Sequence, residues 1–297
     1  MSPRFALLSP ECMRLLDRLE IAVWETRRGR PGGSLPSTSL GLGTRFEEHR
    51  RYAPGDDLRY LDWNALGRLG EPFTKQFARE EAGRLTLLLD RTASMASDPA
   101  LESTARSVSA LLAYVGLRTG YHVEVIPLPL SEEREHHGLG GFFGSGAVGE
   151  LGAWIEGVEF GVPAPLFPAV RQAVAGRELG AATFLVSDLA DPDAGERILR
   201  LLRAHRCQPA LVQLFSPLAR DPVPLGHREL LDPETGGTLR IRVTPRLRRA
   251  FLERLARFHE RVRHRCRALG VRHVRLAAGQ VADRAMVRRL REGGVLR

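Results

Sequence analysis

Several features that mark membrane-spanning, secreted or metal-binding proteins are missing from this 297-residue chain. No apolar run reaches the roughly 18–20 residues that a helix needs to span a bilayer. The start, MSPRFALLSPECMRLL, has no apolar block of the kind found in secretory signals. The 3 cysteines include no CxxC pair, which favours neither a disulfide framework nor a zinc site. These absences predict a cytoplasmic protein without a transmembrane segment.

Lysine is almost absent, because Lys75 is the only lysine among 44 basic residues. Thr74 precedes it, so the chain has no phosphate-binding loop of the GxxxxGK[ST] type. Residues 240–297 contain 18 arginines and 4 acidic residues, whereas residues 1–239 contain 26 basic and 31 acidic residues. Such a basic segment can attract nucleic acid, anionic lipid or an acidic protein, but it is more often a solvated arginine-rich helix face.

From residue 85 onward, apolar segments of strand length alternate with helical patterns. Strands are expected near 85–89, 122–126, 182–187, 209–215 and 272–276, and helices near 99–118, 166–175, 194–205, 245–269 and 282–291. This alternation predicts an α/β fold in which helices cover both faces of a mainly parallel sheet. In the helix expected at 245–269, an apolar stripe runs from Leu247 to Leu269, so we expect that stripe to cover the sheet.

Local patterns assign four further segments. Ser9 and Pro10 are expected to begin a helix that ends near residues 27–29. Leu16, Leu19 and Val23 would lie on one face of this helix. Residues 138–149, GLGGFFGSGAVG, are expected to form a mobile loop. A strand is expected around residues 73–77, and a hairpin over residues 230–241 that turns at 234–237.

The segment TLLLDRTASMAS runs from an apolar strand into Asp90 and then spaces the hydroxyls of Thr92 and Ser94 at every second residue. Asp188 follows a second apolar strand, ATFLVS. If these strands are neighbours in a parallel sheet, both carboxylates face one crevice. Two carboxylates with two hydroxyls suit Mg²⁺. The structural alternative is that Ser94 caps the following helix and Asp90 only tightens a turn.

Enzymatic functions receive less support from the sequence. An aspartate nucleophile of the DxDxT type requires a second acid at position 92, which is threonine here. No histidine, lysine or cysteine is placed by the sequence as acid, base or nucleophile. A metal held by Asp90 and Asp188 can in principle activate water for phosphoester hydrolysis, so a metal-dependent hydrolase is one alternative function. Nucleic-acid binding by the basic C-terminal helix is the other.

Two motifs resemble known families. LLLDRTASM is similar to the DxSxS metal-ion-dependent adhesion site of von Willebrand factor A domains, with Thr92 in place of the first serine. RRYAPGDDLRYLDWNALGR, residues 50–68, resembles the hallmark of the bacterial family of unknown function DUF58, in which this segment precedes an A-type domain. The resemblance implies a doubly wound, von Willebrand factor A-like domain over residues 81–297. Residues 1–80 would then be a small N-terminal appendage carrying the Pro-Gly-Asp-Asp signature.

The same resemblance implies a function. In A-type domains, an acidic side chain of a partner completes the coordination of the metal, which gives ligand roles for Mg²⁺ to Asp90, Thr92, Ser94 and Asp188. The pattern departs in GVPAPLFPAV, residues 161–170, where Ala164 or Pro165 stands in the place of the threonine of such sites; the resemblance fails at Ala164, so the adhesion site is partial. The family is commonly encoded beside MoxR-type AAA+ ATPases. The resemblance therefore implies a non-catalytic adaptor for such an ATPase.

The Pro-Gly-Asp-Asp signature has two interpretations of its own. It either forms a docking surface or forms a partly buried network that ties the N-terminal segment to the main domain. In the second case its acids pair with nearby arginines and Trp63 packs beneath them. Interleaved charged and aromatic residues favour this structural role. The residues concerned are Asp56, Asp57, Arg59, Asp62 and Trp63, with Arg45, Arg50, Arg51 and Arg68 as partners.

Overall fold

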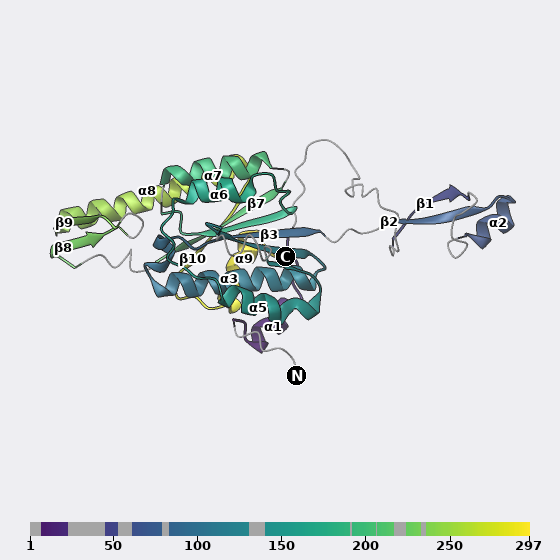
Figure 1. Cartoon of the computed structure of the whole chain (residues 1–297), viewed down its shortest axis with the longest axis horizontal. Helices are drawn as coiled ribbons and strands as arrows, with labels where there is room; N and C mark the ends of the chain where they lie inside the picture. Colours follow the sequence, from purple (N-terminus) through teal and green to yellow (C-terminus); the bar gives the residue numbers. More distant parts are fainter. Residues whose placement is uncertain are drawn as a thin grey trace. The chain divides into compact units, whose positions relative to one another are not determined.

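The computed structural model describes residues 7–22, 45–52, 61–78, 83–130, 140–190, 192–205, 207–216, 224–232 and 236–297. The chain forms two compact units (Figure 1). The larger unit combines Met1–Glu25 with Arg84–Arg297, and the smaller unit is Thr26–Gly83. The first residues therefore group with the larger unit, which differs from the division at residue 80 expected from the sequence.

A six-stranded sheet forms the centre of the larger unit, with the strand order β10-β7-β6-β3-β4-β5. All neighbouring pairs are parallel except β4 and β5, which are antiparallel. The predicted α/β fold with a mainly parallel sheet is therefore confirmed. The strands are β3 (Arg84–Asp90), β4 (His122–Leu128), β5 (Gly140–Phe142), β6 (Ala182–Ser187), β7 (Gln208–Phe215) and β10 (Arg272–Ala277).

Helices cover both faces of this sheet, as expected (Figure 1). On one face lie α1 (Pro10–Leu16), α3 (Pro99–Arg118), α5 (Val148–Glu156) and α9 (Arg284–Glu292). On the other lie α6 (Leu166–Val174), α7 (Pro192–Ala204) and the second half of α8 (Pro245–Leu269). In the part of the chain that the structure describes, no helix has the length and apolar character needed to cross a membrane.

The continuous apolar run of β3 follows from burial on both of its faces. Successive side chains of a strand point to opposite faces. Leu87 and Leu89 accordingly pack in the core on the α3 side, and Leu88 packs in the core on the α6 side. A central strand of a parallel sheet therefore requires apolar residues at nearly every position.

The N-terminal helix is shorter than the sequence pattern predicts. Its start is as expected, because Ser9 Oγ accepts the Cys12 amide hydrogen bond at 3.1 Å. It ends at Leu16, however, and not near residues 27–29. Ile21 instead forms an antiparallel bridge with Leu296. Pairing with the C-terminal residues gives this segment an extended backbone, so the prediction of a longer helix was wrong.

The prediction of a mobile loop at residues 138–149 is also wrong for the described part of that segment, residues 140–149. This segment contains β5, the short helix η3 (Ser145–Ala147) and the beginning of α5. Phe142 is buried in the core, and its ring lies edge-on to Trp154 with 6.3 Å between the ring centroids. One buried aromatic side chain thus fixes an edge strand whose glycine content suggested a loop.

The smaller unit contains the antiparallel strands β1 (Arg45–Arg51) and β2 (Phe73–Ala78), with α2 (Trp63–Leu69) between them in sequence. The strand expected around residues 73–77 is therefore confirmed. Asp62 caps α2, because its carboxylate accepts hydrogen bonds from the next helical amides. Trp63 is the first residue of α2 and is 67% exposed, so its expected packing beneath the signature is wrong. Asp56, Asp57 and Arg59 lie outside the described residues.

The predicted hairpin is confirmed as β8 (Gly226–Leu231) and β9 (Thr238–Val243), and it leads directly into α8. The apolar stripe of α8 covers the sheet only in its second half, where Val262 and Cys266 are buried. In the first half Leu247 is 43% exposed and Phe251 is 48% exposed. A helix of 25 residues is about 38 Å long, whereas the six-residue β10 spans about 20 Å. The helix therefore extends beyond the sheet, and the expected coverage by its first half is wrong.

Candidate functional site

The candidate site lies at the carboxyl ends of two neighbouring strands. Asp90 is the last residue of β3, and Asp188 directly follows β6, which ends at Ser187. The two strands are parallel neighbours, with Leu89 opposite Val186. The adjacency on which the predicted crevice depends is therefore confirmed. After β3 the chain forms β4 on one side of β3 and later β6 on the other side, so the strand order reverses between β3 and β6. In open parallel sheets, ligands collect at the carboxyl ends of the strands beside such a reversal.

Three hydrogen-bond donors hold the buried Asp90 carboxylate, which is 1% exposed. Its Oδ1 accepts from the Thr92 backbone N–H at 2.9 Å and from Thr92 Oγ1 at 2.7 Å. Its Oδ2 accepts from Ser187 Oγ at 2.6 Å. Both carboxylate oxygens are thus fixed in orientation by side chains and backbone from two strand ends.

A continuous chain of oxygen contacts connects Asp90 to Asp188. Thr92 Oγ1 lies 3.1 Å from Ser94 Oγ, and Ser94 Oγ donates to Asp188 Oδ1 at 3.3 Å. The Ala190 amide also donates to Asp188 Oδ1, at 3.1 Å. Asp188 is half-buried, whereas Asp90, Thr92 and Ser94 are buried. The structure thus brings all four predicted side chains together, with Asp188 nearest to solvent.

The structural alternative for Ser94 does not hold. The helix that follows is capped by Asp98, whose carboxylate accepts from the Ala100 amide at 2.9 Å. Ser94 lies in the short helix η2 (Ala93–Ala96), and its hydroxyl contacts Thr92 and Asp188. Asp90 does tighten its turn through the Thr92 amide, so the turn and the convergence of oxygens coexist at this position.

The ionisation of the two carboxylates is unfavourable in this environment. The pKa of Asp90 is raised to about 7, mainly by burial and also by the negative charge of Asp188, although hydrogen bonds from Ser187 and Thr92 oppose the shift. Burial also raises the pKa of Asp188. No described basic side chain pairs with either carboxylate, so a cation placed between them would supply the compensating charge.

The side chains present fit Mg²⁺ in chemical type. They offer two carboxylates and two hydroxyls, all hard oxygen donors, and Mg²⁺ characteristically uses one or two carboxylates while keeping several waters. Among the described residues, no group of three or more histidine, cysteine, aspartate or glutamate side chains is arranged for metal binding. A cation at this site would therefore depend on the hydroxyls and on water as well as on Asp90 and Asp188.

The segment that contains Ala164 runs beside the Asp90 turn. The amides of Gly161 and Val162 donate to the Arg91 carbonyl at 3.0 and 3.2 Å, and Thr92 forms a parallel bridge with Val162. Ala164 follows two residues later and is half-buried. Its methyl group has no electron pair for a metal, so this loop offers no side-chain ligand at that position.

Two residues of the site were not selected from the sequence. Ser187 holds Asp90 Oδ2, and its position at the end of a strand beside β3 was the available signal. Arg91 is buried and connects neighbouring loops, because its Nε donates to the Pro129 carbonyl at 2.9 Å and its guanidinium donates to the Glu159 carbonyl at 3.3 Å. No sequence pattern indicated that role for Arg91.

Comparisons with known proteins cover part of the chain. Uncharacterized proteins from Mycobacterium tuberculosis and Mycobacterium bovis are 30% identical to it over 86 residues, which is 29% of this chain and 27% of theirs. The matched segment thus spans about a quarter of the length of these curated relatives. The crystal structure of the conserved hypothetical protein BatB from Bacteroides thetaiotaomicron aligns with a TM-score of 0.36 and 11% identity, covering 71% of this chain and 98% of that one.

The family match includes the beginning of the candidate site. Residues 48–135 match the family described as "Protein of unknown function DUF58". This segment contains Asp90, Thr92 and Ser94 but not Asp188. The resemblance expected from the sequence is thus confirmed over residues 48–135, where this chain matches the DUF58 family, whose function is unknown.

Proposed function

We propose that this protein is a non-catalytic interaction module that binds a carboxylate of a partner protein through Mg²⁺ held by Asp90, Thr92, Ser94 and Asp188. The observation that carries the proposal is the continuous chain of oxygen contacts between two carboxylates at the ends of adjacent parallel strands. Bound Mg²⁺ would supply the positive charge that a partner's acidic side chain requires.

The surroundings of the carboxylates favour recognition over turnover. Within the described part of the chain, the hydrogen-bond partners of Asp90 and Asp188 are hydroxyl groups and backbone amides only. None of these partners is an imidazole, amine or thiol that could act beside the carboxylates as acid, base or nucleophile. Here both oxygens of Asp90 are already engaged, and Asp90 therefore serves best as a fixed ligand.

The fold supports an A-type assignment of the larger unit. The crevice lies beside the central strand, at the point where the order of the strands reverses, and helices cover both faces. The departure at Ala164 leaves one coordination position to water. The partner class follows from the resemblance to DUF58 proteins, which implies a MoxR-type AAA+ ATPase.

The proposal is tested by measuring binding of the MoxR-type ATPase encoded nearest to this gene, by calorimetry, in 1 mM Mg²⁺ and in EDTA. Wild type should bind in Mg²⁺ only, and Asp90→Ala should abolish binding. Glu156→Ala removes one exposed acidic side chain outside the site and should bind as wild type. Absence of binding by wild type would refute the adaptor role. Binding unaffected by EDTA and by Asp90→Ala would retain the adaptor and remove the metal site.

A further inference from the structure

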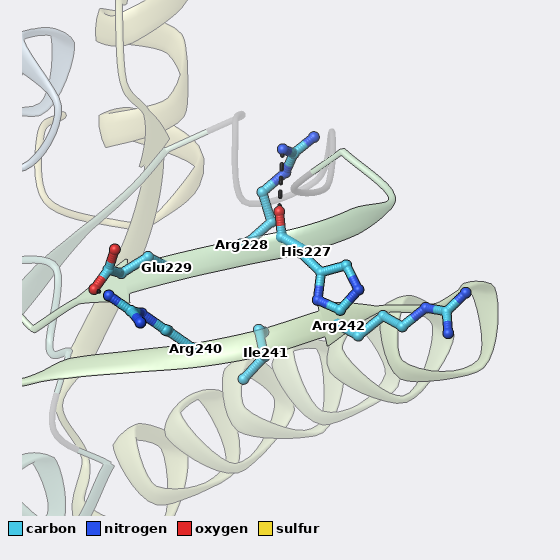
Figure 2. Close-up of a pocket in the computed structure, with 6 residues that line it drawn as sticks. All are labelled: His227, Arg228, Glu229, Arg240, Ile241 and Arg242. Atoms are coloured by element: carbon cyan, nitrogen blue, oxygen red, sulfur yellow. Dashed lines mark hydrogen bonds and ion pairs between the residues drawn. The ribbon is translucent and has the colours of Figure 1, made fainter.

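The hairpin and the first half of α8 form a second, separate surface with an unusual share of exposed apolar side chains. We call β8, β9, Leu225 and residues 245–257 the hairpin–helix surface. In Figures 1 and 2 the hairpin runs alongside α8. Six of the nine large hydrophobic side chains found exposed in the described residues lie here: Leu225, Leu230, Leu231, Leu239, Leu247 and Phe251. Such a concentration marks an interaction site more often than isolated exposed residues do.

The same surface carries positive charge that its own acids do not neutralise. Arg240 on β9 pairs with Glu229 on β8 at 3.4 Å. On α8, exposed Arg246, Arg248 and Arg249 form no ion pair with another described residue. These three cations lie within one turn of Leu247, so apolar and positively charged groups alternate on the protruding helix.

A shallow hollow of about 450 Å³ opens on the hairpin. Figure 2 shows its lining side chains, which come from both strands: His227, Arg228, Glu229, Arg240, Ile241 and Arg242. Arg228 donates to the carbonyls of Pro224 and Leu225, which holds its guanidinium against its own strand. The hollow therefore combines positively charged side chains, one of them held in place, with a half-buried isoleucine, a combination that suits an acidic side chain with an apolar neighbour.

We propose that the hairpin–helix surface is a docking site for an acidic, amphipathic segment of a partner protein. Charge complementarity identifies the sign of the partner, because arginines that form no ion pair with a described residue favour an anionic one. The exposed leucines identify its apolar component, since they lose water only against other apolar side chains. This site is separate from the Asp90 crevice and does not depend on Mg²⁺.

Other anionic partners fit the surface less well. Single-stranded nucleic acids bind proteins by stacking their bases on aromatic rings, and only Phe251 among the six apolar side chains has such a ring. An anionic lipid surface carries no cations to place beside Glu229 and Glu253, which are both exposed within this surface. A protein segment can place its own cations beside these acids.

A selection experiment reads the chemistry of the partner directly. A phage-displayed library of random 16-residue peptides is selected on the full chain in EDTA, which removes any contribution of the Asp90 crevice. The expected peptides are rich in Glu and Asp and carry leucine or phenylalanine at helical spacing. Enrichment of neutral or basic peptides, or no enrichment above the library background, would overturn the proposal.

Matched variants locate the binding site. The tightest selected peptide, labelled with fluorescein, should bind at least tenfold more weakly to Leu247→Ser/Phe251→Ser by fluorescence anisotropy. The control Phe143→Ser/Val281→Ser removes two still more exposed apolar side chains elsewhere and should change affinity less than twofold. Equal losses in both double variants would contradict the assignment.

Charge variants test the arginines independently of the apolar residues. Arg246→Glu/Arg248→Glu/Arg249→Glu should also weaken binding at least tenfold. In the control, Arg288→Glu/Arg289→Glu/Arg291→Glu changes three exposed residues of α9 and makes the same change of net charge. Its affinity for the peptide should stay within twofold of wild type. Circular dichroism verifies that each variant is folded. If the Leu247→Ser/Phe251→Ser variant does not fold, the charge variants alone test the proposal. Tighter wild-type binding to a 20-base-pair DNA or to phosphatidylserine vesicles than to the peptide would refute a protein partner.

Discussion

Replacing Asp90 with asparagine should stabilise the protein at alkaline pH in the absence of metal. Asparagine keeps an acceptor for the Thr92 amide and hydroxyl, which now bind Asp90 Oδ1. At the other position its amide N–H₂ can donate to Ser187 Oγ, which already accepts the Leu189 amide at 2.9 Å and has a second electron pair. The substitution therefore removes the buried charge while keeping the hydrogen bonds.

The magnitude follows from the pKa of Asp90, which burial and the charge of Asp188 together raise from 3.8 to about 7 against the opposing hydrogen bonds. One pKa unit corresponds to about 1.4 kcal/mol, so the ionised side chain destabilises the folded state by about 4 kcal/mol above pH 7. Between pH 3.8 and 7 the folded state binds more protons than the unfolded state, and the free energy of unfolding of wild type falls as pH rises. About 3 kcal/mol of this loss falls between pH 5 and pH 8.

Guanidinium titrations of both proteins in EDTA, followed by circular dichroism at pH 5 and pH 8, measure the effect. The stability advantage of Asp90→Asn over wild type should grow by about 3 kcal/mol between the two pH values. Glu156→Gln, which changes an exposed acid, should show no such growth. If Asp90→Asn is less stable than wild type at pH 8, or if its advantage does not depend on pH, the buried charge is not the cause.

Three further predictions concern the metal and the core. Adding Mg²⁺ at a hundred times its dissociation constant should stabilise wild type by about 2.7 kcal/mol and leave Asp90→Asn unchanged in thermal unfolding, and equal shifts in both proteins would place the ion elsewhere. Ala164→Thr should tighten Mg²⁺ binding several-fold in calorimetric titrations, since it supplies a hydroxyl to the loop beside the Asp90 turn, and unchanged affinity would mean that position 164 does not face the metal. Phe142→Ala should lower the free energy of unfolding by about 3–5 kcal/mol, whereas Phe143→Ala at the exposed neighbouring position should cost less than about 0.5 kcal/mol, and similar costs would contradict the burial of Phe142.

The strand and helix pattern of the larger unit could be predicted from sequence because burial determines it locally. In β3 nearly every side chain is apolar, since both faces are covered, and in α3 the cap and first-turn proline mark the start. The predictions that were wrong concern elements determined by contacts with residues distant in the sequence. The end of α1 is set by pairing of Ile21 with Leu296, and β5 is held by burial of Phe142. Neither contact leaves a periodic signal.

The two carboxylates of the candidate site could be predicted from the sequence, but the residues that hold them in place could not. Asp90 and Asp188 follow apolar strands, so the rule that ligands collect at the carboxyl ends of parallel strands was sufficient to pair them. The contribution of Ser187 depends on the register between β3 and β6, which no local pattern reveals. The exposed first half of α8 was mispredicted because periodicity shows which face of a helix is apolar but not how far the covering sheet extends.

Hydrogen–deuterium exchange of this chain in complex with the MoxR-type ATPase tests the central claim most directly. If a metal-held carboxylate forms the contact, the ATPase should protect residues 90–97 and 188–190 in Mg²⁺, and EDTA should remove this protection. Protection restricted to the hairpin–helix surface, or protection around Asp90 that persists in EDTA, would contradict a metal-dependent contact at the crevice.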